Sequence, residues 1–213
     1  MTPQEASIAA EKICRLAPVV PVLVVDQVAH AAPLAQALVA GGLPALEVTL
    51  RTDAALEVIA EMSRVDGGAV GAGTLLTSKD VENAKAAGAT FGVSPGATDR
   101  LLDACEANDL PLLPGAASAS EAMRLLERGY TVQKFFPAEA AGGAPFLKSL
   151  ASPLPQIRFC PTGGVSLKNA MDYLSLPNTL CVGGSWVAPG DLVMVGDWDR
   201  ITELAKEAAQ LGA

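Results

Sequence analysis

Short apolar segments recur along this chain, and each is followed by a Gly- or Pro-containing turn and then by a stretch with helical periodicity. Segments of this length, rich in Val, Leu and Ile, predict strands. We expect eight of them, at residues 19–25, 45–50, 69–73, 90–94, 111–113, 132–136, 157–160 and 179–182. From the second onward their starts lie about 22 residues apart, which is the length of one strand–turn–helix unit.

Helix signals agree with this repeat. Three of the expected helices begin with residues that accept hydrogen bonds from a first turn, namely Thr77, Thr98 and Ser118. Eight strands alternating with helices build either a closed (β/α)8 barrel or an open doubly wound sheet. The count of eight and the even spacing favour the barrel. We therefore expect one α/β domain over residues 1–213, a (β/α)8 TIM barrel with an extra N-terminal helix at 3–16 and a C-terminal helix at 199–211.

Composition excludes several classes of protein. Half of the residues are hydrophobic and 18% are charged, which argues against disorder. The longest apolar run, residues 18–25, is too short to cross a bilayer, and the N-terminus lacks a signal-peptide pattern. A net charge of -8 disfavours nucleic acid as a partner. Four cysteines without a Cys-x-x-Cys pair predict reduced thiols in the cytoplasm, and a single histidine argues against a histidine-based metal site.

Residues 45–51 place charge on an interior face. Side chains alternate along a strand, so Glu47 and Arg51 share the face that points into a barrel, while Leu46 and Val48 point toward the helices. Charged groups on an interior stripe are costly unless they are paired or functional. Glu47 and Arg51 are therefore candidate site residues, and a structural Glu–Arg ion pair is the alternative.

Lys134 occupies the apolar strand expected at 132–136. Burial of an ammonium group is costly, and desolvation favours the neutral amine, which can form a Schiff base with a ketone. Alternation puts Phe136 on the same face as Lys134, where its ring would wall the amine, and turns Gln133 away. The alternative is that the lysine stem packs while its head reaches water.

Glycines follow the last two expected strands, in Thr162-Gly163-Gly164 and in Gly183-Gly184-Ser185. Glycine-rich loops expose backbone N–H groups that bind phosphate, together with the N-terminus of a following helix. Loops after strands 7 and 8 often hold phosphate in (β/α)8 barrels. We therefore expect a phosphate site there. The fragment Gly71-Ala72-Gly73-Thr74 is too incomplete for a dinucleotide fingerprint.

Taken together, residues 46–51, 71–74, 94–96, 134–139, 159–164 and 183–186 resemble the bacterial 2-keto-3-deoxy-6-phosphogluconate (KDPG) aldolase family over essentially the whole chain. The resemblance implies a metal-independent class I aldolase without a cofactor, a homotrimer of (β/α)8 barrels. Such an enzyme splits KDPG into pyruvate and glyceraldehyde 3-phosphate in the Entner–Doudoroff pathway. It also implies cleavage of 4-hydroxy-2-oxoglutarate (KHG) to pyruvate and glyoxylate.

The same resemblance assigns roles to single residues. It implies that Lys134 forms the Schiff base and that Glu47 moves the protons. The remaining roles are carboxylate binding by Arg51 and Thr74, shaping of the pocket by Pro95 and Phe136, and phosphate binding by Gly163, Gly164, Gly184 and Ser185. Three alternatives stay open: an aldolase for the galactonate epimer, a phosphate-binding isomerase or synthase that works without an imine, and a non-catalytic sugar-phosphate sensor.

Overall fold

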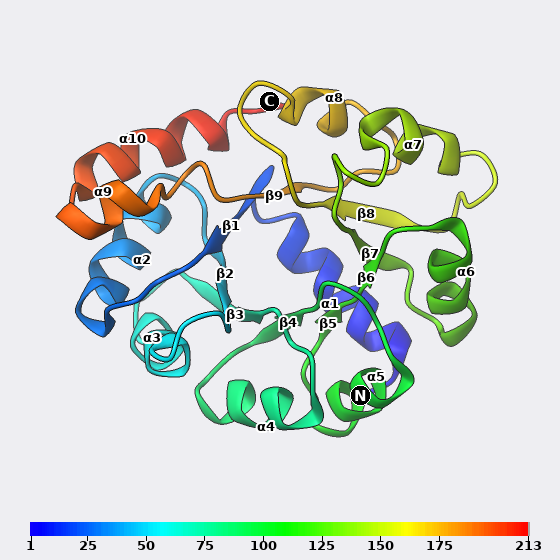
Figure 1. The fold of residues 1–213 in the computed structure, drawn as a ribbon, viewed down its shortest axis with the longest axis horizontal. Helices are drawn as coiled ribbons and strands as arrows, with labels where there is room; N and C mark the ends of the chain where they lie inside the picture. Colours follow the sequence, from blue (N-terminus) through cyan, green and yellow to red (C-terminus); the bar gives the residue numbers. More distant parts are fainter. Residues whose placement is uncertain (213) are drawn as a thin grey trace.

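A ring of parallel strands with helices around it forms the molecule (Figure 1), which we describe over residues 1–212 from a computed structural model. The strands are β1 (Val19–Leu23), β2 (Ala45–Thr49), β3 (Ala69–Gly73), β4 (Phe91–Val93), β5 (Leu112–Leu113), β6 (Gly115–Ala116), β7 (Val132–Phe135), β8 (Arg158–Pro161) and β9 (Val182–Gly184). The helices are α1 (Pro3–Cys14), α2 (Ala31–Ala40), α3 (Ala55–Met62), α4 (Ser78–Ala86), α5 (Asp99–Ala107), α6 (Ala119–Arg128), α7 (Gly143–Leu150), α8 (Ala170–Leu174), α9 (Gly190–Val195) and α10 (Trp198–Ala209), with a 3-10 turn at Val28–His30.

The strands close into a barrel. β5, β4, β3, β2, β1 and β9 pair in that order, and β6, β7 and β8 form a second run. β5 and β6 are two halves of one barrel strand separated by Pro114, which lacks the N–H that a ladder needs. A bridge between Thr162 and Gly183 joins the end of β8 to β9. The (β/α)8 barrel is thus confirmed, and the open sheet is excluded because the first strand pairs with the last.

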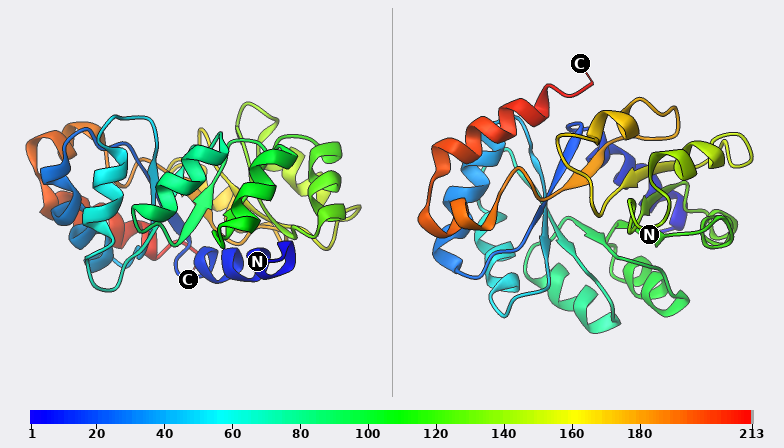
Figure 2. Two further views of the ribbon diagram at one scale, coloured as in Figure 1. Left: turned by 90° about the horizontal axis from the view of Figure 1, so that it is seen from below. Right: turned by 45° about the horizontal axis from the view of Figure 1, so that its top comes forward.

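Two apolar layers hold the barrel. The larger layer lies between the strands and the outer helices and contains Leu46 and Val48 of β2. The smaller layer fills the interior of the barrel and includes Ala10 and Cys14 of α1. α1 crosses the amino-terminal end of the barrel, as the left view of Figure 2 shows. This helix closes one end, so a ligand must enter at the carboxyl ends of the strands.

Several predicted helix starts are confirmed. The side chains of Thr77, Thr98 and Ser118 each accept a hydrogen bond from a backbone N–H three residues on. Thr2 caps α1 in the same way, with Glu5 completing a capping box. None of the helices described here is long and apolar enough to cross a membrane.

Strand boundaries differ from the prediction at both ends of the chain. The first strand ends at Leu23 instead of residue 25, and the last lies at Val182–Gly184 instead of 179–182. Thr179 forms only an isolated bridge to Phe159, and pairing with β1 begins at Val182. Gly183 and Gly184, expected in a loop, are therefore strand residues. Low β-propensity of glycine hid this register, because a strand of glycines has no side-chain signature.

Candidate active site

Lys134 and Glu47 meet inside the barrel from β7 and β2, which stand on opposite sides of the ring. Lys134 Nζ lies 3.3 Å from Glu47 Oε1, and the two side chains are 4% and 3% exposed. The predicted orientation of both residues is confirmed. Lys134 does not reach bulk water, and the ion-pair partner of Glu47 is Lys134 instead of Arg51.

Gln133 points away from the interior of the barrel, as predicted. Gln133 is buried beneath α6, and its Nε2 donates hydrogen bonds to the carbonyls of Ala122 and Tyr130, at 3.0 Å each. Since neighbouring residues on a strand point to opposite faces, this contact fixes Lys134 on the interior face.

Burial of the pair disfavours the charged form of Glu47. Burial raises the pKa of Glu47 above 4.5, and the nearby Lys134 partly opposes this shift. The Phe136 ring stands 5.3 Å from Lys134 Nζ, which is within the range of a cation–π contact. The lysine and carboxyl thus share a largely dry compartment, in which their side chains are in direct contact.

Arg51 lies at the mouth of the barrel, just beyond the end of β2. Its Nε donates a 3.2 Å hydrogen bond to Thr74 Oγ1 at the end of β3. Thr74 adopts the left-handed region with φ 62°, which is unusual for a β-branched residue. The contact leaves other guanidinium N–H groups free for an anion, because Arg51 is exposed and forms no ion pair within residues 1–212.

A pocket of about 200 Å³ opens beside this arginine. It is lined by Val22, Val24, Arg51, Phe136, Thr162, Gly163, Gly164, Val165, Gly183, Gly184 and Ser185. Every residue predicted to bind phosphate is among them. Pro95 is not among them; its backbone instead packs against Gly115, where a Cβ would meet it at 2.3 Å.

Thr162 is a pocket residue that sequence reasoning missed. It is buried, and a Cβ on Gly183 would lie only 2.3 Å from its Oγ1. Strand alternation could have predicted this residue, because Thr162 comes two residues after the inward-facing Cys160 and so shares its face.

Several backbone N–H groups in the two glycine-containing turns lack an acceptor in residues 1–212. Within the described chain, the backbone N–H groups of Gly163, Gly164, Val165, Ser185 and Trp186 donate no hydrogen bond. Such groups in glycine-rich turns are typical anion-binding donors. The helices that follow, α8 and α9, have only five and six residues and begin at Ala170 and Gly190. Because both helices are short, the turns themselves carry most of the unpaired donors, and the contribution of helix N-termini stays a prediction.

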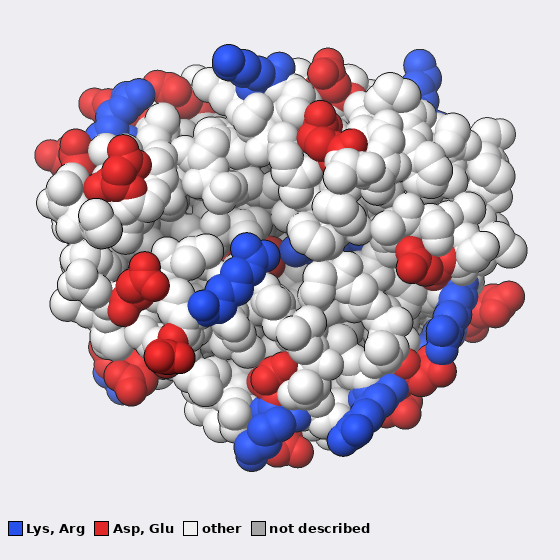
Figure 3. All heavy atoms as spheres, viewed as in Figure 1, with Lys and Arg blue, Asp and Glu red and all other residues white. Residues whose placement is uncertain are grey.

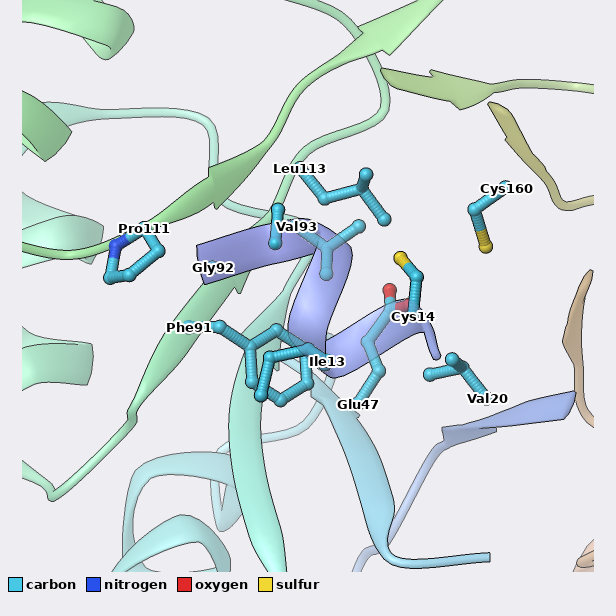
Figure 4. Close-up of a pocket in the computed structure, with 11 residues that line it drawn as sticks. Ile13, Cys14, Val20, Glu47, Phe91, Gly92, Val93, Pro111, Leu113 and Cys160 are labelled. Atoms are coloured by element: carbon cyan, nitrogen blue, oxygen red, sulfur yellow. The ribbon is translucent and has the colours of Figure 1, made fainter. Parts of the chain in front are cut away.

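A second cavity lies on the α1 side of Glu47 (Figure 4). Glu47, Cys14 and Cys160 point toward it, and the rest of its lining is apolar. Its volume is about 10 Å³, which is room for about one water molecule. This cavity is too small to hold a metabolite.

Charge is arranged unevenly on the face with the strand ends (Figure 3). At the hollowed centre basic atoms are exposed with little acidic surface beside them, whereas toward the rim basic and acidic side chains are interspersed. The chain carries a net charge of -8, so this local excess of positive charge focuses anions on the centre of the face. In residues 1–212 no three His, Cys, Asp or Glu side chains converge as metal ligands do.

Known proteins share this architecture. A family model described as KDPG and KHG aldolase matches residues 10–204. The chain belongs to this family. It is accordingly an aldolase, a carbon–carbon lyase. The 2-dehydro-3-deoxy-phosphogluconate aldolase of Pseudoalteromonas atlantica is 54% identical to it over 94% of each chain.

Two solved structures are close to this aldolase. The KDPG aldolase of Zymomonas mobilis with 3-phosphoglycerate has a TM-score of 0.89 and 52% identity, over 94% of each chain. The KDPG aldolase of Legionella pneumophila, with pyruvate captured as a covalent carbinolamine, has a TM-score of 0.91 and 45% identity, over 94% of this chain and 98% of that one. A covalent carbinolamine is the adduct of an amine with a ketone, so the family uses class I chemistry.

A methyl group on Gly73 is expected to slow this aldolase about a hundredfold, which is the effect of shifting by about 1 Å a carboxyl that is predicted to move the protons. A Cβ there would lie 2.3 Å from Glu47 Oε1 and 2.7 Å from its Cγ, so the carboxyl must shift. Pyruvate release by Gly73→Ala measures the effect. Gly68→Ala is the matched control, since its Cβ would meet no atom closer than 3.6 Å. Equal rates in the two variants would show that a methyl group at position 73 does not displace the Glu47 carboxyl.

Proposed function

We propose that this enzyme cleaves KDPG to pyruvate and glyceraldehyde 3-phosphate through a Schiff base on Lys134. The observation that carries the proposal is the buried contact between Lys134 Nζ and Glu47 Oε1 at 3.3 Å. Neither residue lines the pocket beside Arg51, but the Phe136 ring does, and it stands 5.3 Å from the amine. An amine that attacks a ketone needs a neighbouring group to take and return protons. Glu47 is the ionisable group nearest to this amine.

In the proposed reaction, neutral Lys134 attacks the C2 ketone and water leaves, which gives a protonated imine. Glu47 then takes the proton of the C4 hydroxyl, directly or through a water. The C3–C4 bond breaks, and its electron pair moves into the imine to form an enamine. Glyceraldehyde 3-phosphate departs, C3 is protonated with the help of Glu47, and water releases pyruvate from the lysine. A carboxyl whose pKa is raised by burial suits this double use, because its protonated form is more accessible than that of an ordinary glutamate.

The two ends of the substrate are proposed to bind at separate groups. Arg51 and Thr74 take the carboxylate next to C2, since a guanidinium offers a planar fork that matches it. The N–H groups of Gly163, Gly164 and Ser185 bind the phosphate, and Gly184 lines the same pocket. The Phe136 ring lines the pocket and stands 5.3 Å from Lys134 Nζ, so it shields the imine from water.

KHG is the proposed second substrate. It has the same 2-keto acid end, for which Lys134, Glu47 and Arg51 suffice, and it lacks the phosphate. The match to the family of KDPG and KHG aldolases supports this extension. Binding without the phosphate contacts is expected to be weaker.

A lactate-dehydrogenase-coupled pyruvate assay tests the proposal. We expect pyruvate from KDPG with a higher kcat/KM than from KHG, and a lower rate with the galactonate epimer of KDPG. Faster cleavage of the epimer would assign the enzyme to that sugar. Phosphate binding without pyruvate from any of the three would support a sensor instead.

We also propose a homotrimer that works in the cytoplasm. Met194 and Val195 at the end of α9 are 71% and 76% exposed and provide apolar surface, whereas Trp186 and Trp198 pack on the core of their own chain. Light scattering should then give three times the chain mass of 21.7 kDa. The four free, buried cysteines are typical of a reducing compartment.

A further inference from the structure

The turn at Gly163 and Gly164 is held from behind by groups that take no part in the mechanism above. Both glycines have positive φ, 100° and 81°. The Gly163 carbonyl accepts a 3.0 Å hydrogen bond from the N–H of Glu139, and the Gly164 carbonyl accepts one of 3.2 Å from Asn169 Nδ2. In a trans peptide the C=O and the next N–H point in opposite directions. These two contacts therefore fix the direction of the Gly164 and Val165 N–H groups.

Asn169 holds two parts of the turn at once. Its Oδ1 accepts hydrogen bonds from the N–H of Ser166 at 2.7 Å and from Ser166 Oγ at 3.2 Å, while its Nδ2 binds the Gly164 carbonyl. The side chain thus ties residue 164 to residue 166 and limits the rotation of the peptides between them. Loss of this amide would leave the turn with one fewer restraint on each side of Val165.

Glu139 supports the same glycine through its stem. A Cβ on Gly164 would lie 2.6 Å from Glu139 Cγ, so the stem is in close contact with the turn. The Glu139 carboxylate accepts a hydrogen bond from the hydroxyl of Tyr173, a fully buried residue of α8. A buried tyrosine fixes the rotamer of the glutamate, and the glutamate then limits the position of Gly164. Neither Glu139 nor Tyr173 lines the pocket.

We propose that Asn169 and the Tyr173–Glu139 pair are positioning residues for the phosphate group of the substrate. They act through the Gly163–Gly164 turn and touch no reacting atom. The inference rests on the proposed function for the identity of the substrate, a phosphorylated 2-keto acid. Asn169, Tyr173 and Glu139 thus determine how tightly the phosphate is bound.

The test compares Asn169→Ala and Tyr173→Phe with the wild type on a phosphorylated and an unphosphorylated substrate. We expect KM for KDPG to rise about tenfold in Asn169→Ala, which loses the three hydrogen bonds of the amide, and about threefold in Tyr173→Phe, which loses one. For KHG, which carries no phosphate, the KM of each variant should stay within about twofold. An equal fall in kcat with both substrates would overturn the proposal, because it would indicate general damage to the site.

Matched controls exist elsewhere in the chain. Asn108 Nδ2 also donates to a backbone carbonyl, at 2.8 Å, and the hydroxyl of buried Tyr130 also donates to a glutamate, Glu106, at 3.0 Å. Both lie around α5, away from the pocket. Asn108→Ala and Tyr130→Phe should leave the KDPG-to-KHG ratio of KM unchanged. A change equal to that of the test variants would overturn the proposal.

Binding of inorganic phosphate separates this proposal from the proposed function. Calorimetric titration needs no cleavage, and we expect the phosphate Kd to rise in Asn169→Ala and Tyr173→Phe but not in the controls. If the wild type releases no pyruvate, the proposed function fails while this titration still decides the role of the turn. An unchanged Kd in both test variants would overturn the positioning role even if KDPG is cleaved.

Discussion

Lys134→Met is expected to lower kcat for pyruvate release at least about a thousandfold, because the imine cannot form without the amine. Methionine fills a similar volume and removes the charge, so the barrel should still fold. The raised pKa of Glu47 lets that carboxyl become neutral once its partner is gone. Circular dichroism checks the fold, and the coupled assay measures the rate.

Trapping with borohydride locates the covalent step. In the wild type, pyruvate and borohydride should add a reduced pyruvyl group to the peptide that contains Lys134, and Lys134→Met should gain none. Lys85→Met is the control, since the Lys85 ammonium binds the Asp109 carbonyl at the surface. A label that persists in Lys134→Met, or a variant that still turns over, would remove Lys134 from the nucleophilic role.

Glu47→Gln is expected to reduce kcat by roughly a hundredfold to ten-thousandfold, the usual range for loss of a general acid–base group. The amide keeps the shape but cannot take the C4 proton. The imine with pyruvate should still be trapped, since Lys134 is intact. Glu57→Gln, on the exposed side of α3, is the matched control. Full turnover in Glu47→Gln would rule out the proton-transfer role.

The pH dependence of kcat offers an independent check on Glu47. The carboxyl must be ionised to accept the C4 proton, and burial raises its pKa above 4.5. Activity should therefore fall with decreasing pH at a higher pH than an ordinary glutamate would give. Glu47→Gln should lack this acid limb. If Glu47→Gln keeps the acid limb, the loss of activity at low pH is caused by another titratable group.

The face that each key residue presents could be predicted from sequence. Strict alternation on β2 and β7 indicated that Glu47 and Lys134 point inward and that Gln133 points outward, and all three orientations are confirmed. Alternation works here because a one-residue slip would put Leu46 and Val48 in the interior and the charges beneath the helices. The cost of burying unpaired charge makes that register unacceptable.

Distances and supporting contacts could not be predicted in this way. The 3.3 Å approach of Lys134 to Glu47 depends on closure of the ring, which brings together residues 87 positions apart. The break between β5 and β6 at Pro114 and the strand pairing of Gly183 and Gly184 are also set by neighbouring strands. The propensity of a segment for a strand does not say which other strand it pairs with. For the same reason, the contact of Asn169 with Gly164 could not be predicted from the sequence.

The position of the chain ends has a practical consequence for attaching the enzyme to a solid support. The end of α1 and the end of α10 line one shared surface hollow, on the side of the barrel opposite the open mouth (Figure 2). A tether attached at Gly212 would therefore orient the molecule with its entrance toward the medium. The amino end is less suitable, because the Met1 ammonium pairs with Asp109 and donates to the Glu106 carbonyl, and any extension there would displace these contacts.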